Sequence, residues 1–170
     1  MASSSSSSGH HWIHDVFINF RGTDTRESFV SHLYAALRNA GVNTFFDDEK
    51  LEKGAELGSN LLQAIEGSHI SIVVFSKSYT ESSWCLKELV EIMECRKTHG
   101  QIVVPIFYHI DPSDIRHQKG AFGQALEALA SKIHLGKGVK QSIISKWRTA
   151  LTQASNLSGW DLTTSRFLIN

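Results

Sequence analysis

The fold is decided by the stretch Ile70-Ser71-Ile72-Val73-Val74-Phe75, near the middle of the 170-residue chain. This run is almost wholly apolar, which is typical of an interior strand of a parallel sheet that is covered on both faces. Parallel strands need crossover connections, which are usually helices. The sequence on either side of this run should therefore alternate between strands and helices.

Two strand–helix units precede the central run. The first begins with an apolar stretch at residues 15–20, closed by the turn-like sequence Arg21-Gly22-Thr23-Asp24. Asp24 followed by Glu27 resembles a capping box, so a helix is expected to start there and to end at Gly41. Its expected inward positions, at helical spacing, are Phe29, Leu33, Ala36, Leu37 and Ala40. The second unit has a short strand at 42–46 and a helix that buries Leu61, Leu62 and Ile65.

The pattern continues after the central run. A helix with an apolar stripe follows it, and residues 102–108 predict a fourth strand in which Pro105 favours a bulge or a near-edge position. A loop around Asp111-Pro112-Ser113, a short helix near 120–132 and a final helix complete the chain. The expected inward residues of the helix after the central run are Leu86, Leu89, Val90 and Met93; those of the final helix are Ile143, Ile144, Trp147, Ala150, Leu151 and Ala154.

These elements predict one α/β domain with a flavodoxin-like parallel sheet and helices on both faces. Four strands are clear, in the order 2-1-3-4, and a fifth is left open because no further strand pattern is evident. Residues 1–11 are interpreted as a disordered serine-rich tail, residues 12–162 as the domain, and residues 163–170 as a C-terminal tail or the start of a linker.

Composition excludes several classes of function. The 17 basic residues balance the 17 acidic ones, so no global field favours nucleic acid or an anionic membrane as a partner. The two cysteines, Cys85 and Cys95, lack CxxC or zinc-ligand spacing, and we expect no disulfide scaffold and no metal site. No apolar run approaches the roughly 18–20 residues of a membrane span. We expect a cytoplasmic protein, with nuclear access left open.

In a sheet of this order the ligand crevice lies beyond the carboxyl ends of the first and third strands. The loop after the first strand carries Arg21, and the helix after the third carries Trp84 and Glu88, four residues apart on one face. An arginine can bind phosphate, an indole can stack on a ring, and a carboxylate can stabilise an oxocarbenium-like transition state. A single carboxylate suffices for cleaving a bond to nicotinamide, because that group leaves neutral.

Several blocks, in order, resemble plant Toll/interleukin receptor (TIR) domains over roughly residues 12–162. The opening block is Asp15-Val16-Phe17-Ile18-Asn19-Phe20-Arg21-Gly22-Thr23-Asp24-Thr25-Arg26. The later blocks are Phe45-Phe46-Asp47-Asp48, Ser83-Trp84-Cys85-Leu86-Lys87-Glu88-Leu89, Pro105-Ile106-Phe107-Tyr108, Asp111-Pro112-Ser113-Asp114-Ile115-Arg116 and Ser158-Gly159-Trp160. Several ordered motifs are far more specific than any one of them alone.

The resemblance implies an NAD⁺ glycohydrolase of plant innate immunity that is active when self-associated, with cyclase activity and NADP⁺ use left open. Glu88 matches the catalytic glutamate. Arg21, Gly22 and Trp84 match substrate-pocket positions, and Thr23 beside them is expected in the same site. Residues 48–57 correspond to a mobile loop that helps to assemble the pocket. Ser31 and His32 match a self-association surface, which predicts a homo-oligomer. NAD⁺ is a substrate here, and no cofactor is expected.

Other interpretations remain open at this point. Glu88 could be a solvated helix carboxylate, Arg21 could cap a helix or pair with Asp24, and Trp84 could anchor its helix on the sheet. A non-catalytic scaffold that signals by homotypic association is the main alternative function. A phospho-acceptor or flavin-binding module ranks last, because no acidic pair or phosphate-cradling loop follows the first strand.

Overall fold

A five-stranded parallel sheet forms the centre of the computed structural model, which describes residues 10–47 and 56–162. The strands are β1 (His14–Phe20), β2 (Thr44–Phe46), β3 (Ser68–Phe75), β4 (Ile102–Tyr108) and β5 (Trp160–Leu162), in the order β2-β1-β3-β4-β5. The predicted order 2-1-3-4 is confirmed, and β5 extends it beyond β4. The flavodoxin-like fold class is confirmed as well, with β3 at the centre.

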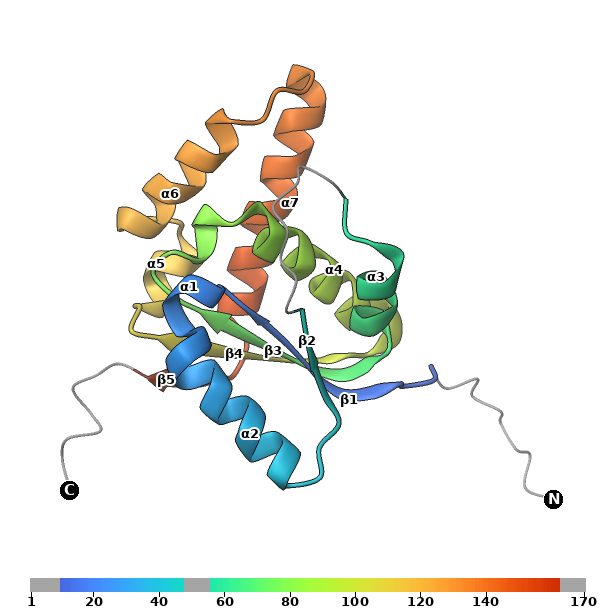
Figure 1. Cartoon of the computed structure of the whole chain (residues 1–170). Coiled ribbons are helices and arrows are strands. Elements are labelled where there is room, and N and C mark those ends of the chain that lie inside the picture. Colours follow the sequence, from blue (N-terminus) through green and yellow to red (C-terminus); the bar gives the residue numbers. More distant parts are fainter. Residues whose placement is uncertain (1–9, 48–55, 163–170) are drawn as a thin grey trace.

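Helices cover both faces of the sheet (Figure 1). One face carries α1 (Gly22–Thr25), the π-helical turn η1 (Arg26–Val30) and α2 (Ser31–Asn39). The other face carries α3 (Ser59–Glu66), α4 (Ser83–His99), α6 (Gly120–Ser131) and α7 (Lys137–Ser155). The short elements η2 (Tyr79–Glu81) and α5 (Pro112–Arg116) connect β3 to α4 and β4 to α6. None of the helices among the described residues has the length and apolar character needed to cross a bilayer.

The alternation of side chains along β1 divides the core into two clusters. Val16, Ile18 and Phe20 point toward α2 and join the smaller cluster. Phe17 points the other way and joins the larger cluster with α3, α4, α6 and α7. Because successive strand residues face opposite sides, Asn19 also points toward the α4 face. This places one polar side chain of β1 in the larger core.

β5 has only three residues, which explains why its pattern is not evident in the sequence. It pairs with the carboxyl half of β4, with Ile106 opposite Trp160. The preceding Gly159 runs so close to β4 that an added Cβ would lie 2.0 Å from the carbonyl oxygen of Pro105. Pro105 itself pairs with Val73 of β3. Its strand, β4, lies next to the edge strand β5, so the predicted near-edge position is confirmed.

Three local predictions are wrong. Asp24 does not form a capping box, because its carboxylate instead accepts hydrogen bonds from Ser78 in the loop after β3. Ala36 and Ala40 are exposed, because α2 packs on the sheet through the half-buried Leu33, Tyr34 and Leu37, with Phe29 of η1 beside them. The expected loop at 111–113 begins α5, with the Asp111 side chain capping the helix through the Ser113 amide at 2.9 Å.

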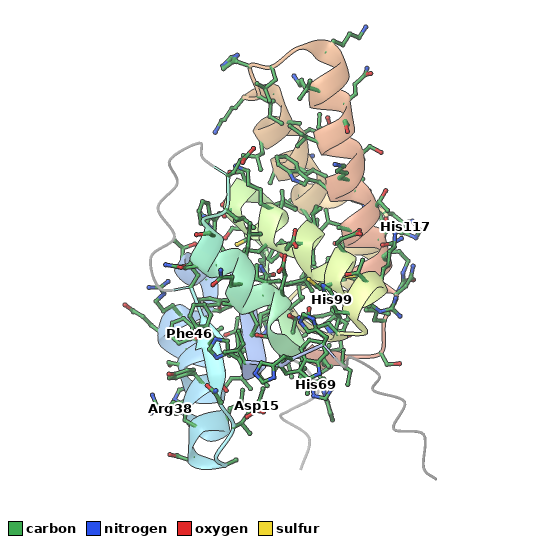
Figure 2. All side chains as sticks on the ribbon, turned by 90° about the vertical axis from the view of Figure 1, so that its right-hand side faces the viewer. Asp15, Arg38, Phe46, His69, His99 and His117 are labelled. Atoms are coloured by element: carbon green, nitrogen blue, oxygen red, sulfur yellow. The ribbon has the colours of Figure 1, made fainter. Side chains whose placement is uncertain are left out.

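The remaining core predictions hold with small differences. Leu86, Leu89 and Met93 of α4 are buried, as are Trp147, Ala150, Leu151 and Ala154 of α7. Val90, Ile143 and Ile144 are half-buried. At the amino-terminal end of the sheet, His69 and His99 lie close to the incoming chain (Figure 2), where Trp12 stacks on His69 and His10 stacks on His99.

Candidate functional site

Glu88 lies in the second turn of α4, directly against the sheet. The helix starts after Ser82, whose hydroxyl accepts a hydrogen bond from the Cys85 amide at 3.2 Å. From there the helix runs along β1, and the Glu88 side chain has 0% exposed surface. A solvated helix carboxylate is therefore excluded. A charged group at such a position needs polar partners, because burying an isolated carboxylate is strongly unfavourable.

Asn19 supplies one of these partners. Its Nδ2 donates to Glu88 Oε1 at 3.2 Å and to the Cys85 carbonyl oxygen at 3.3 Å. The Tyr79 hydroxyl in turn donates to Asn19 Oδ1. Asn19 and Tyr79 are both fully buried, and neither was expected in the site from the sequence. The available signal was Asn19 itself, a polar residue in an otherwise apolar strand.

Arg21 and its neighbours form the turn that follows β1. Arg21 and Gly22 are half-buried and Thr23 is exposed, with the Arg21 carbonyl oxygen accepting a hydrogen bond from the Thr25 hydroxyl at 3.1 Å. Asp24 fastens this turn to the loop after β3, because its Oδ2 accepts a hydrogen bond from the Ser78 amide at 2.9 Å and its Oδ1 accepts one from the Ser78 hydroxyl. The two loops that the topology brings together are thus physically joined.

The pKa of Asp24 reflects this attachment. Burial raises the pKa of the carboxyl group, but hydrogen bonds from serine hydroxyls and from the Ser78 amide lower it, and so does the Arg21 charge. The net result is a pKa below the ordinary value. Arg21 therefore exerts its charge on Asp24, as the non-catalytic interpretation of Arg21 anticipated.

Trp84 connects the start of α4 to the carboxyl end of β2. Its indole Nε1 donates to Asp47 Oδ2 at 2.8 Å, and its half-buried ring packs against the larger core cluster. Anchoring and ligand stacking are compatible for a ring in this position. The predicted pocket loop at 48–57 lies mostly outside the described residues. Only its residues 56 and 57 are described.

A hollow of about 320 Å³ opens at the carboxyl edge of the sheet. It is lined by Asp24, Ser76, Lys77, Tyr108 and His109. It occupies the predicted crevice beyond β1 and β3 and extends toward β4. Glu88 and Trp84 are not part of its lining, so the structure brings the predicted site residues to one end of the sheet without gathering them around this hollow.

Ser31 and His32 lie at the start of α2, away from the Glu88 region. Both are exposed, as a self-association surface requires. Their side chains also contact the preceding turn, since the Ser31 hydroxyl donates to the Ser28 carbonyl oxygen at 3.2 Å and His32 Nδ1 lies 2.5 Å from the same oxygen. The geometry leaves this surface open to a protein partner.

Comparison with known proteins identifies the family. A model of the TIR domain matches residues 13–167. The chain belongs to the TIR domain family. This TIR domain is 49% identical over 157 residues to the disease resistance protein RPV1 of Vitis rotundifolia, and 50% identical over 161 residues to the TMV resistance protein N of Nicotiana glutinosa. These matches cover 92% and 94% of the chain but 11% and 13% of the two relatives, so the chain spans a small part of their length.

A solved structure agrees with this assignment. The TIR domain is 43% identical to a chain in the structure of the activated Roq1 resistosome directly recognizing the pathogen effector XopQ (TIR domains). The TM-score is 0.77, and the match covers 89% of each chain. The resemblance to TIR domains of plant disease-resistance proteins is thereby confirmed for both sequence and fold.

Proposed function

We propose that this TIR domain is an NAD⁺ glycohydrolase that acts when self-associated, in the cytoplasm, as part of plant innate immunity. The observation that carries the proposal is the position of Glu88, a fully buried carboxylate at the sheet edge where β1 and α4 meet. A carboxylate in a water-excluded site stabilises developing positive charge far more strongly than one in water. Cleavage of the nicotinamide–ribose bond creates such a charge on the ribose.

The roles of the other residues follow from their positions. The Arg21–Gly22–Thr23 turn lies at the same carboxyl end of the sheet. It suits the phosphates of a dinucleotide, because a guanidinium can form bidentate hydrogen bonds with a phosphate. Trp84 presents an aromatic ring at the start of α4. Glu88 is closed to solvent in this structure, so substrate entry requires a rearrangement of the segments that cover it. Self-association would supply the energy for that rearrangement.

Two features support assembly and the context in which it occurs. Ser31 and His32 are exposed on the first turn of α2, where a second copy can reach them. The similar Roq1 TIR domains belong to an activated resistosome, and the similar curated proteins are disease-resistance proteins. A homo-oligomer formed through the Ser31–His32 surface is therefore part of the proposal. NADP⁺ is an alternative substrate of the same chemical class.

The test measures nicotinamide release from NAD⁺ by protein held in a defined oligomer through a fused oligomerisation module. Glu88→Gln keeps the shape of the side chain and removes its charge, and we expect it to lower turnover at least about 100-fold. Glu94→Gln, an exposed glutamate of the same helix, is the matched control and should keep wild-type activity. Chromatography of the products separates hydrolysis from cyclisation.

The competing function is a non-catalytic scaffold, which the exposed Ser31–His32 surface and the closed Glu88 site favour. Wild-type protein that is assembled but releases no nicotinamide would reject the enzyme in favour of the scaffold. Equal activity of wild type and Glu88→Gln would reject Glu88 as the catalytic residue. Ser31→Ala with His32→Ala should reduce self-association in sedimentation experiments without the fused module, under either function.

A further inference from the structure

Three fully buried polar side chains form a continuous hydrogen-bonded chain beside the start of α4. The Tyr79 hydroxyl donates to Asn19 Oδ1, and Asn19 Nδ2 donates to Glu88 Oε1 at 3.2 Å. All three residues have 0% exposed surface. They come from η2, β1 and α4, so the chain links three separate elements at one point.

The orientation of the Asn19 amide is determined by its neighbours. The Cys85 carbonyl oxygen, 3.3 Å from Asn19 Nδ2, can only accept a hydrogen bond. A flipped amide would turn its own oxygen toward this carbonyl and toward the Glu88 carboxylate, placing acceptor against acceptor twice. These neighbours therefore favour the orientation in which Asn19 presents an N–H group to Glu88 and its oxygen to the Tyr79 hydroxyl.

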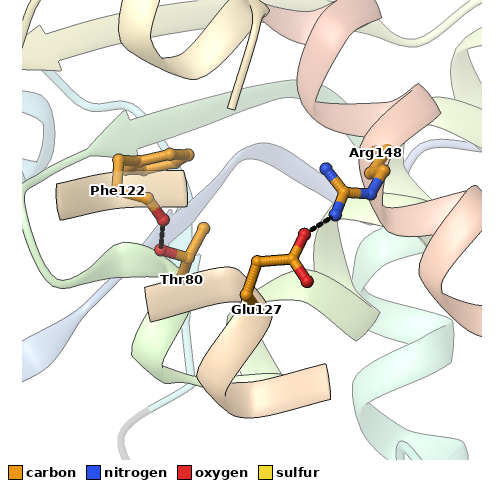
Figure 3. Close-up of polar contacts among 4 residues, drawn as sticks. All are labelled: Thr80, Phe122, Glu127 and Arg148. Atoms are coloured by element: carbon orange, nitrogen blue, oxygen red, sulfur yellow. Dashed lines mark hydrogen bonds and ion pairs between the residues drawn. The ribbon is translucent and has the colours of Figure 1, made fainter. Parts of the chain in front are cut away.

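Tyr79 is itself held firmly. Its ring packs edge-on against Phe75, with centroids 5.0 Å apart at 64°. The next residue, Thr80, donates its hydroxyl to the Phe122 carbonyl oxygen of α6 at 2.7 Å (Figure 3), which ties η2 to the helix layer. The Cys85 carbonyl oxygen, which belongs to α4, lies 3.2 Å from the Tyr79 hydroxyl oxygen and can share its proton with Asn19. Tyr79 is thus connected to α4 directly and to α6 through Thr80.

The electrostatics keep Tyr79 a donor. Burial, followed by the influence of Cys85 and Glu88, raises the pKa of the Tyr79 hydroxyl well above its ordinary value, although the hydrogen bond to Asn19 lowers it. The hydroxyl therefore stays protonated at neutral pH. Its proton is available to Asn19 at every pH at which an enzyme assay is practicable.

We propose that Asn19 and Tyr79 are positioning residues that hold the Glu88 carboxylate in its reactive orientation and favour its charged form. This inference rests on the glycohydrolase function proposed above and assigns neither residue a contact with substrate. An amide N–H that donates to a carboxylate stabilises the ionised state. A preorganised carboxylate also needs no reorientation when positive charge develops on the ribose.

The fold contains a matched arrangement without a carboxylate. The Ser71 hydroxyl donates to Gln101 Oε1 at 2.9 Å, and Gln101 Nε2 donates to the carbonyl oxygens of Ile65 and Ser68, both at 2.7 Å. This is also a buried hydroxyl–amide–carbonyl chain on the same sheet. Ser71→Ala therefore removes the same kind of bond as Tyr79→Phe, in a set of hydrogen bonds that does not include Glu88.

The experiment compares nicotinamide release by wild type, Tyr79→Phe, Asn19→Leu and Ser71→Ala in the same assembled form, with the folded fraction of each measured by near-ultraviolet circular dichroism. Rates are expressed per folded molecule. For Tyr79→Phe we expect kcat to fall about tenfold with KM unchanged, as expected for one hydrogen bond that acts in the transition state. Asn19→Leu should lower kcat about 100-fold, the scale of a misplaced catalytic group.

The pH profile separates positioning from mere stability. Loss of the donated N–H should move the acidic limb of the kcat/KM profile of Asn19→Leu to higher pH, while Ser71→Ala keeps the wild-type profile and a kcat within about twofold. If Tyr79→Phe and Ser71→Ala lose equal activity per folded molecule, or if no limb moves, the positioning role is overturned and the glycohydrolase stands. If assembled wild type releases no nicotinamide, the proposed function is rejected, and the positioning role with it. Should Asn19→Leu fail to fold, Tyr79→Phe decides alone, because it keeps the packed ring.

Discussion

Replacing Asp24 by asparagine should loosen the connection between the loops that follow β1 and β3. In the structure the Ser78 amide donates to Oδ2 at 2.9 Å, and the Ser78 hydroxyl donates to Oδ1. Asparagine keeps one acceptor oxygen but turns an N–H₂ group toward one of the two donors. The substitution thus removes a charge and one hydrogen bond while it preserves the shape of the side chain.

The magnitude follows from the kind of bond that is lost. Hydrogen bonds to a charged group contribute about 1.5–3 kcal/mol, and the lower end applies because Asp24 is only half-buried. We expect the free energy of unfolding to fall by about 1.5 kcal/mol. In a domain of this size each 1 kcal/mol lowers Tm by roughly 2–4 °C, so Tm should fall by roughly 3–6 °C.

The effect should depend on pH in a defined direction. The folded-state pKa of Asp24 lies below its ordinary value, because the hydrogen bonds and the Arg21 charge outweigh the opposing effect of burial. A lowered pKa contributes stability that is fully present above the unfolded-state pKa, near 3.9, and that is lost as the pH falls through the folded-state pKa. The difference between wild type and Asp24→Asn should therefore be complete at pH 7 and should shrink below about pH 4.

Urea unfolding of both proteins at pH 7 and at pH 3.5 measures this difference. Glu127→Gln is the control, since Glu127 forms an exposed ion pair with Arg148 (Figure 3) and should change stability little at either pH. Equal stability of wild type and Asp24→Asn at pH 7 would refute the structural role of the Ser78 contact. A difference that persisted unchanged at pH 3.5 would refute its electrostatic origin.

Three further predictions concern Asp47, Gly159 and Cys95. Asp47→Ala removes the acceptor of the Trp84 indole at 2.8 Å, so acrylamide should quench the tryptophan fluorescence more strongly than in wild type, and unchanged quenching would contradict the contact. Gly159→Ala would place a Cβ 2.0 Å from the carbonyl oxygen of Pro105, so the free energy of unfolding should fall by about 1–3 kcal/mol in urea titrations, and a wild-type midpoint would argue against the close approach. Burial, followed by nearby glutamate charges, raises the pKa of the Cys95 thiol to about 12. Iodoacetamide at pH 8 should therefore modify Cys95 only once the protein is unfolded, which mass spectrometry can follow. Rapid labelling of the native protein would contradict the burial.

Much of the fold could be predicted because it depends on local periodicity. The apolar run around Val73 indicated an interior strand, and the spacing of Leu86, Leu89 and Met93 indicated a helix that faces the sheet. The order 2-1-3-4 of the first four strands was preferred because strands that alternate with helices suit a flavodoxin-like sheet with right-handed connections. β5 was not predicted, because three residues are too few for a pattern and its pairing with β4 depends on the close passage of Gly159.

Part of the candidate site could likewise be predicted from the sequence, and part could not. The sequence by itself placed Arg21, Trp84 and Glu88 at one end of the sheet, since chain order and topology determine where loops and helix starts lie. Only the tertiary structure showed that Glu88 is buried and that Asn19, 69 residues away along the chain, donates to it. Hydrogen bonds between side chains depend on a few ångströms and on rotamers, and residues so distant in sequence acquire a defined distance only when the strands and helices pack. The sequence thus determined which expected groups lie at this end of the sheet, and packing decided which side chains touch them.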